Sequence, residues 1–477
     1  MTIKAPARLI LTLLFVASAL SARAALIDPV DFTTAGFVGM ATQGPLDQPV
    51  LVNNYPEFTA IFGSSTAGLA NPYLAPSVAG YFANGGVGLV VVRIASVDAA
   101  TVIGVDGGAP GLRTGLQALL DVDEVSFIAI PGVATPAVQT AMIAHCENAG
   151  DRMAILDPAS SNDVNAIQVQ RSGLVTDNGF AALYFPWVQA SPTGTSLLLP
   201  PSGFVAGAYS AKEPPDAPVG VIATASGVAY AVSAAEQDLL NPQGINAIRD
   251  LSGIRIWGAR TLASSPDWIY VSSRRLGLFI EESIAQSTQW CLFEPNDFNL
   301  WAVLEQDMDD FLYELWVQAW LQGATPGEAY FANCGLGTTM TQTDIDEGRT
   351  ILQMGFAPVR PVEFNVLSVV HQRPDLTAAQ DMAATQLKLL PPTPNPFNPT
   401  TTLRFELTED ARVDLRVFDA AGRLVRTILA DQWLSAGEYR RRWDGKDNGG
   451  RSVGSGVYLA RIQGDGMVQL RRMVLVR

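Results

Sequence analysis

The side chains that most often carry out catalysis are scarce in this chain. Only two histidines, His145 and His371, occur among its 477 residues, and neither belongs to a pair with the spacing of metal ligands. His145 directly precedes Cys146 in a segment with helical spacing, and adjacent helical positions point about 100° apart. A Cys–His nucleophile needs its two groups to converge, so we interpret His145 as a structural residue.

Three further segments have only a superficial likeness to ligand-binding loops. GGVG (85–88) and CGLGT (334–338) lack the Gly-Lys-Ser/Thr signature of a phosphate loop, and we expect turns there. WDGKDNGG (443–450) does not have the acidic spacing of an EF-hand, and we expect a hairpin tip, with a loose surface calcium site as the alternative. Glu281 and Glu282 diverge on a helix. We find no catalytic constellation, and predict neither enzymatic activity nor a cofactor or metal.

Composition favours a large, weakly charged chain of two to four domains. Apolar residues make up 48% of the chain and charged residues 16%, which fits a subunit that buries surface against its own copies or a large monomer. The three cysteines, Cys146, Cys291 and Cys334, are widely spaced and odd in number, so they form no disulfide framework. We expect buried free thiols.

The net charge of −15 is unevenly distributed. From Pro391 to the end there are 14 basic and 10 acidic residues, and residues 1–24 hold three basic residues and no acidic one. Residues 25–390 therefore hold 14 basic and 36 acidic residues, a net −22. So acidic a body repels phosphate backbones, and we predict no nucleic-acid partner.

The first 24 residues have the three-part pattern of a secretory signal peptide. Lys4 and Arg8 are followed by an uncharged apolar run over residues 9–20, and Ala22 and Ala24 supply small residues for signal cleavage. The run is too short to span the roughly 30 Å hydrocarbon core comfortably. We predict export to the cell surface or the extracellular space, with no membrane insertion after signal removal. A buried N-terminal helix is the alternative.

Apolar spacing predicts an α/β (α+β) body. Strands and short helices are expected to alternate through the first hundred residues, with strands at 35–41, 49–52 and 89–94 and helices near 56–62 and 74–82. From residue 112 to residue 200, helical and buried-strand segments continue to alternate. This rhythm is typical of a layered sheet.

A collinear series of segments between residues 33 and 371 adds a family resemblance. The series opens with TTAGFVG, PVLVNNYPEFTAIFG and VVVRIA, and it closes with EQDLLNPQGINAIRDLSGIRIWGARTL, SSRRLGLFIEESI and TMTQTDIDEGRTILQMGFAPVRPVEFNV. This order resembles the contractile tail-sheath proteins of phage tails and bacterial injection machines. The resemblance implies a helically polymerising subunit whose body has an N-terminal part, an inserted α/β domain and a C-terminal part, at residues 25–104, 105–210 and 211–371.

A long amphipathic helix is expected over residues 300–321. Its apolar stripe contains Leu304, Met308, Phe311, Leu315 and Ala319, and its opposite face, which includes Asp307, is acidic. The sheath resemblance implies that a C-terminal helix lines the lumen and grips an inner tube. We hypothesise that a basic inner-tube protein binds this helix through Glu305, Asp309, Asp310 and Glu314. A solvated helix face is the alternative.

The last hundred residues change character. A Pro-rich linker is expected at 372–399, followed at 400–477 by short alternating strands that predict an all-β sandwich. NPFNPTT, FDAAGRLVRTI and WDGKDNGGRSVGSGVY resemble the immunoglobulin-like C-terminal domains, related to a flagellar hook-cap module, of exported bacterial proteins. In some phyla such domains address proteins to type IX secretion. A sorting address, a passive cap and an adhesive module all stay open.

Together these patterns predict an exported, self-assembling structural subunit with an outward β-sandwich, and they leave an inner-tube protein open as a second partner. Sheath proteins typically have an extended arm before TAGFVG, whereas cleavage near Ala24 would leave only ALIDPVDF ahead of TTAGFVG. We therefore keep two alternatives. In one, the leader stays uncleaved and serves as the arm; in the other, the chain is a secreted or surface-displayed binding or adhesion protein that reuses the fold without forming a tube.

Overall fold

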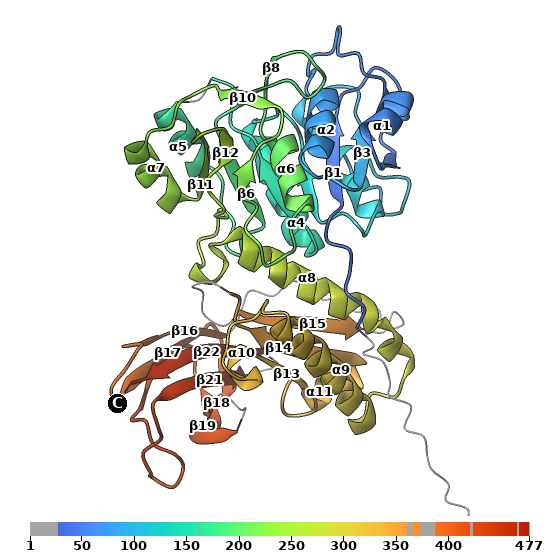
Figure 1. Cartoon of the computed structure of the whole chain (residues 1–477). Coiled ribbons are helices and arrows are strands. Elements are labelled where there is room, and N and C mark those ends of the chain that lie inside the picture. The colour runs from blue at the N-terminus through green and yellow to red at the C-terminus, as the bar shows by residue number, and fades with distance from the viewer. Residues whose placement is uncertain are drawn as a thin grey trace, which may run out of the picture.

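The computed structural model describes residues 27–161, 163–359, 365–372, 387–419, 423–464 and 467–476. The expected leader, with Ala22 and Ala24, lies outside the described residues. An α/β part lies above a smaller helical and β part, and a β-sandwich lies beside the latter (Figure 1). Within the described residues, no helix has the length and apolarity needed to cross a membrane.

A mixed nine-stranded sheet forms the upper part, in the order β2-β3-β1-β4-β5-β6-β11-β12-β9. From β3 to β11 neighbouring strands are parallel, and β2, β12 and β9 are antiparallel to their neighbours. Buried on both faces, the parallel strands are continuous apolar runs such as AGFVG and MAIL. The strands are β1 (Ala35–Gly39), β2 (Pro49–Val52), β3 (Leu89–Arg93), β4 (Phe127–Ala129), β5 (Met153–Leu156), β6 (Ala181–Phe185), β9 (Gly220–Val221), β11 (Ile245–Asp250) and β12 (Ile254–Ile256).

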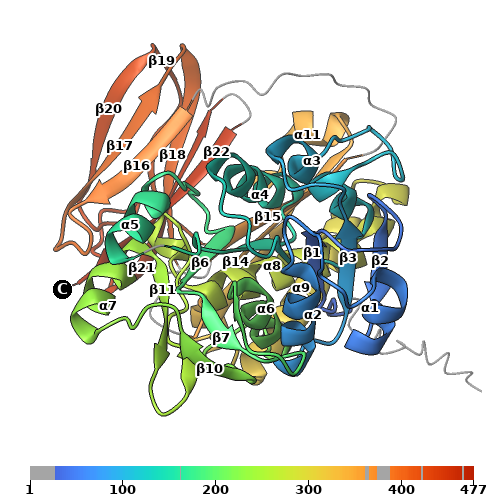
Figure 2. The ribbon, with the colours of Figure 1, turned by 90° about the horizontal axis from the view of Figure 1, so that it is seen from above.

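Helices cover both faces of this sheet (Figure 2). One face carries α1 (Tyr55–Phe62), α2 (Leu74–Ala83) and α6 (Ser202–Ser210); the other carries α3 (Ala99–Ile103), α4 (Pro136–Ala149) and α5 (Val164–Ser172), with α7 (Ala234–Leu240) against α5. A small sheet of β10 (Ala225–Val228), β7 (Val188–Ala190) and β8 (Leu197–Leu199) lies above α6, and 3-10 turns occur at Gly115–Asp121, Asn241–Gln243, Pro266–Trp268 and Gln289–Phe293. Strands from both sides of residue 104 thus belong to one sheet.

The lower part packs two long helices on a three-stranded antiparallel sheet. The helices are α8 (Val271–Ser287) and α9 (Phe298–Val317), the sheet has the order β13-β14-β15, and the remaining elements are α10 (Pro326–Ala329), α11 (Gln342–Asp346), β13 (Tyr330–Cys334), β14 (Arg349–Phe356) and β15 (Asn365–Gln372). The Asp297 carboxylate caps α9 by accepting the backbone N–H groups of Asn299 and Leu300. The helix ends at Val317 rather than at the expected residue 321 because Ala319 adopts φ 61°, a left-handed conformation that cannot continue it.

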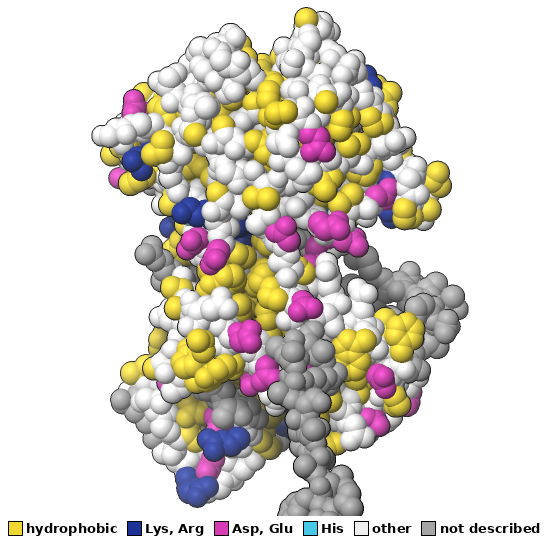
Figure 3. All heavy atoms as spheres, turned by 45° about the vertical axis from the view of Figure 1, so that its right-hand side comes forward, with side chains coloured by type: hydrophobic (Ala, Val, Ile, Leu, Met, Phe, Trp, Pro, Cys, Tyr) yellow, Lys and Arg dark blue, Asp and Glu magenta, His cyan; other side chains and the backbone are white. Residues whose placement is uncertain are grey.

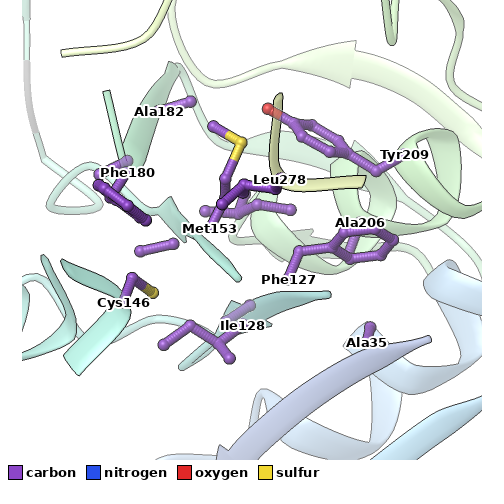
Figure 4. Close-up of a cluster of buried hydrophobic side chains, with 14 of the residues drawn as sticks. Ala35, Phe127, Ile128, Cys146, Met153, Phe180, Ala182, Ala206, Tyr209 and Leu278 are labelled. Atoms are coloured by element: carbon purple, nitrogen blue, oxygen red, sulfur yellow. The ribbon is translucent and has the colours of Figure 1, made fainter. Parts of the chain in front are cut away.

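Helix α8 lies across the amino ends of the parallel strands and joins the two parts. Its Leu278 is buried among Phe127, Met153, Phe180 and Tyr209, which come from the starts of three strands and from α6 (Figure 4). Both parts therefore share one continuous hydrophobic core.

Two adjacent buried arginines of α8 secure this junction. The guanidinium of Arg275 donates to the carbonyl oxygens of Tyr209 (2.8 Å), in the last turn of α6, and Lys212 (2.7 Å), just beyond it, and more weakly to those of Glu213 and Asp216 (both 3.3 Å). These bonds reinforce the turns after α6, where the Lys212 N–H donates to the Tyr209 carbonyl and the Asp216 N–H to the Glu213 carbonyl. Arg274 lies instead over the rings of Phe180 and Trp268, with 3.9 and 4.6 Å from its Cζ to the ring centroids.

The tail is a seven-stranded sandwich with its own core, centred on Phe405, Leu415 and Trp443. One sheet has the order β16-β17-β20 and the other β19-β18-β21-β22, with β16 (Leu387–Thr393), β17 (Thr401–Leu407), β18 (Ala411–Asp419), β19 (Leu424–Leu434), β20 (Gly437–Trp443), β21 (Gly456–Gly464) and β22 (Met467–Leu475). The sandwich begins at Leu387, earlier than the expected residue 400. Pro391 and Pro392 fit in β16 because it is an edge strand whose register shifts between Leu390 and Thr393.

Replacing Arg275 with methionine should lower the free energy of unfolding by about 3 kcal/mol, because it removes the four hydrogen bonds that this buried guanidinium donates. Urea denaturation followed by tryptophan fluorescence measures this. Arg255→Met is the control, since that half-buried guanidinium donates, among the described residues, to a single carbonyl, that of Leu251. Equal losses for the two variants would contradict the role given to Arg275.

A chain that ends at Gln372 should keep a folded body, because the cores of body and tail are separate clusters. Within the described residues, the side-chain bond that it loses, from Arg461 Nη1 to the Gly337 carbonyl at 3.0 Å, is exposed and worth at most about 1 kcal/mol. Calorimetry should find the body's melting transition within a few degrees of its position in the full chain. Loss of that transition would mean that the tail belongs to the body's core.

Candidate assembly surfaces

The histidine and cysteine side chains considered for catalysis are buried and do not form a joint site. His145 and Cys146 lie inside the body; burial lowers the pKa of His145 to about 4 and raises the pKa of the Cys146 thiol. All three cysteines are free and buried, as their spacing predicted. Among the described residues, no cluster of three or more His, Cys, Asp or Glu side chains has a geometry that could hold a metal ion.

His371 has a structural contact instead. Its Nε2 lies 2.7 Å from the Thr288 hydroxyl oxygen, and this hydroxyl donates its own proton to the Ile284 carbonyl. Nε2 is therefore the donor, and the bond fastens β15 to the end of α8. Burial lowers the pKa of His371, which keeps the ring neutral at pH 7.

A buried carboxylate at the carboxyl ends of the parallel strands, on the opposite side of the upper part from α8, escaped the sequence analysis. Asp157, just after β5, accepts from the Ser202 N–H (2.8 Å), the Ser202 hydroxyl (2.7 Å) and the Gly132 N–H (2.9 Å). Burial raises its pKa to about 6 although these bonds favour the charged form. The carboxylate ties the start of α6 to the loop after β4, so its role is structural.

The acidic residues of α9 form two rows on the solvent side of the helix. Glu305 and Asp309 make one row and Asp310 and Glu314 the other; three of these side chains are exposed and Asp310 is half-buried. Asp307, expected on the same face, is buried on the opposite side. The helix contains five acidic residues and no basic one, and no ion pair joins the four solvent-side carboxylates to a Lys or Arg among the described residues.

In the isolated subunit, two carboxylates of this acidic surface have raised pKa values. Partial burial, and then the charge of Asp309, raise the pKa of Glu305. Partial burial and the charge of Asp310 likewise raise the pKa of Asp309, although the Tyr330 hydroxyl donates to it. Both carboxylates are thus more costly to ionise in the fold than in an unfolded chain.

Aromatic side chains flank the acidic rows, and the sequence analysis missed them. Phe293 is 87% exposed and Phe298, on the first turn of α9, is 75% exposed. Beside them a hollow of about 400 Å³ is lined by residues that include Trp290, Leu300 and Val303. The sequence signals this feature only by placing aromatic residues in the short polar connection between α8 and α9. Exposed aromatic rings next to charge are typical of protein interfaces.

The segment before β1 and the strand β15, two places where neighbouring subunits could exchange chain segments, both lie on the chain's own body. The N–H groups of Asp28 and Val30 donate to the hydroxyls of Ser287 (3.0 Å) and Ser283 (3.1 Å) on α8, and Phe32 is buried between Phe127 and Phe279. β15 pairs with β14 over its whole length. It nevertheless forms an edge of its sheet, where another strand could add.

Comparison with known proteins matches two regions of the chain. Residues 108–262 match the phage tail sheath protein central domain, and residues 394–466 match the FlgD Ig-like domain. The body of the chain resembles the contractile tail sheaths in both sequence and fold. The match begins three residues after the expected start of the inserted domain, at residue 105, and continues beyond its expected end at residue 210.

Relatives along the whole sheath-like body support this resemblance. A prophage major tail sheath protein of Pseudomonas aeruginosa (strain UCBPP-PA14) is 27% identical over 338 residues, 66% of this chain and 83% of that protein. The contracted PVC sheath complex, an extracellular contractile injection system, matches with 26% identity and TM-score 0.60 over 77% of this chain and 97% of the solved one. The anti-feeding prophage baseplate matches with 28% identity and TM-score 0.59, covering 74% and 96% of the two chains.

Neutralising Glu305 and Asp309 together, as Glu305→Gln with Asp309→Asn, should stabilise the free subunit by about 0.5 kcal/mol at pH 7. Because both pKa values are raised in the fold, the wild type carries the penalty above the folded pKa values. The gain should disappear as pH falls below the unfolded values. Urea denaturation at pH 7 and at low pH measures the difference.

Asp344→Asn is the matched control with the opposite sign. Burial alone would raise the pKa of Asp344, but bonds from Thr341 and Arg349 hold it below its usual value. Its carboxylate therefore stabilises the fold above the unfolded pKa, and removing its charge should destabilise the protein at pH 7. A clear loss of stability in the Glu305/Asp309 variant would assign those acids a structural role instead.

Proposed function

We propose that this chain is an exported structural subunit that assembles helically into a sheath-like tube and carries its β-sandwich outward. The observation that supports this most is the extent of the likeness, since the chain covers 96–97% of two solved proteins from contractile systems. Helical growth needs a heterologous contact that does not close on itself, and a sheath-type body supplies such contacts.

The acidic surface of α9 is the proposed contact with an inner tube. Its four solvent-side carboxylates, Glu305, Asp309, Asp310 and Glu314, have no basic partner in the described part of the chain. A tube protein with a basic surface would neutralise this charge, and the exposed rings of Phe293 and Phe298 would supply apolar contact area. The alternative, a helix face that only contacts solvent, would account for neither the raised pKa values of its carboxylates nor the exposed aromatic rings beside it.

Export is proposed from the pattern of the first 24 residues and from the tail domain. Cleavage after Ala24 would leave two residues before Ile27, which is already buried. Two residues reach less than about 7 Å, too little to add a strand to a neighbour's sheet. In an exported tube, contacts between subunits would therefore use the edge at β15 and the faces of the body. An uncleaved leader would restore an arm.

A second function, a secreted or surface-displayed binding protein that does not form a tube, is favoured by one observation. The segment before β1 and the strand β15 are both accommodated within one subunit, on α8 and on β14. Sedimentation of the purified full chain over a wide concentration range separates the two functions. Growth of large particles supports the sheath-like subunit, whereas a persistent monomer supports the binding protein. N-terminal sequencing of assembled material then distinguishes cleaved from uncleaved leaders.

Reversing two charges of the proposed lumen surface, as Asp309→Lys with Asp310→Lys, should abolish co-sedimentation with a basic tube protein from the producing organism. It should leave self-assembly of the subunit intact, because neither carboxylate has an ion-pair partner within the described residues. Asp238→Lys on α7 with Asp346→Lys on α11 is a control with the same change in charge, since both side chains are exposed. Unchanged tube binding by the α9 variant would rule out this contact.

A further inference from the structure

The tail domain has a basic surface on one of its sheets. In β16, β17 and β20 the side chains alternate between the sandwich core and solvent, and Leu389, Leu403 and Phe405 point inward. The outward positions include four basic residues, which we call the tail basic face: Lys388, Arg404, Arg440 and Arg442.

The tail basic face is only partly neutralised by its own carboxylates. Its outward positions also hold Glu406, opposite Lys388, and Glu438, opposite Glu406, so four basic and two acidic side chains leave a net charge of +2. No ion pair involves its four side chains among the described residues, although Arg412, Arg416, Arg423 and Arg451 elsewhere in the tail are all paired with aspartates. Arg404 lies directly opposite Arg440 in the ladder of β17 and β20. Like charges in that position are destabilising, so the arrangement costs stability in the free subunit.

The tail basic face points away from its own body. The opposite sheet is the one that contacts the body, because Arg461 on β21 donates to the Gly337 carbonyl. The view from above also places β16, β17 and β20 on the side of the sandwich away from the body (Figure 2). Carboxylates beyond the face's own Glu406 and Glu438 must therefore come from outside this subunit.

A complementary acidic surface exists at the waist of the body. Acidic side chains gather along the junction between the upper and lower parts (Figure 3). We define the acidic waist by six carboxylates around α8, none of which has an ion-pair partner among the described residues: Asp28, Asp31, Asp123, Glu124, Glu281 and Glu282. Partial burial and neighbouring carboxylates, including Asp151 and Asp123, raise the pKa of Glu282.

We propose that the tail basic face docks on the acidic waist of a second copy of this chain, so that the tail fastens neighbouring subunits together. The inference rests on the proposed function, because helical assembly is what brings the tail of one subunit beside the body of another. Contacts of this kind add specificity and sensitivity to salt. The docking gives the tail a role besides those of sorting address, passive cap or adhesive module.

A charge-swap experiment on the full chain tests this docking. One variant reverses the tail face with Arg404→Glu, Arg440→Glu and Arg442→Glu; the other reverses the waist with Asp28→Lys, Asp123→Lys and Glu124→Lys. Each variant alone presents two surfaces of like sign, and we expect self-association at low salt to weaken about tenfold. An equimolar mixture pairs opposite charges at both contacts and should restore association. Analytical ultracentrifugation measures all three samples.

The control reverses three paired arginines of other tail surfaces, Arg412→Glu, Arg423→Glu and Arg451→Glu, and has the same change in net charge. It should associate like the wild type. Circular dichroism verifies that each variant is folded; if the triple tail variant unfolds, Arg440→Glu with Arg442→Glu, both exposed, replaces it.

The outcomes separate this docking from helical assembly itself. Wild-type tubes whose formation is unaffected by reversal of the tail face would overturn the docking and leave the proposed function standing. Restoration by the mixture without tubes in electron micrographs would support the docking and contradict the tube. A wild type that stays monomeric would contradict both. Unchanged association together with lost retention on heparin would assign the tail basic face to an anionic polysaccharide instead.

Discussion

The structure depends on α8, which packs against the upper α/β part with one face and against the lower helical and β part with the other. Its Leu278 fills the space below the parallel strands, while Phe279 on the next position packs on Phe311 of α9, with 6.1 Å between ring centroids. The buried guanidinium of Arg275 donates to carbonyls in the last turn of α6 and just after it, bonds that an apolar side chain could not make. The position of α9, and with it the proposed lumen surface, follows from this one helix.

Charged side chains inside the subunit have partners within it, whereas those of the three charged surfaces have no ion-pair partner among the described residues. Buried charges have specific partners: Arg275 has carbonyls, Asp157 has Ser202 and Gly132, and Arg152 has Asp151 and the Leu119 carbonyl. The solvent-side acids of α9, the acidic waist and the tail basic face have no such ion-pair partners within the described residues. Surfaces whose charge is costly in the free subunit and is relieved by an oppositely charged partner are what an assembling protein requires.

Much of the fold could be predicted from local sequence patterns. The strands near residues 35–41 and 89–94 and the helix that Gly63 caps follow directly from apolar spacing and turn chemistry. The end of α9 at Val317 did not follow, because the turn at Ala319 forces a non-glycine residue to positive φ in a tertiary context. The start of the sandwich at Leu387 was missed since prolines mark a linker until their strand is known to be an edge.

The candidate surfaces were less predictable than the fold. Glu305, Asp309, Asp310 and Glu314 could be proposed from helical spacing, but the burial of Asp307 on the same helix could not, because it depends on what packs there. The bonds of Arg275 span 59 to 66 positions in the chain, and no local pattern contains such a contact. The tail basic face needed the strand register, which brings Arg404 opposite Arg440.

Electron microscopy of material released by cells that produce the native chain tests the central claim most directly, provided that mass spectrometry identifies the protein in whatever is seen. The account predicts regular helical tubes outside the cell, built from this chain. Scattered single particles containing the intact protein would contradict it and would indicate a secreted binding protein with a sheath-like fold.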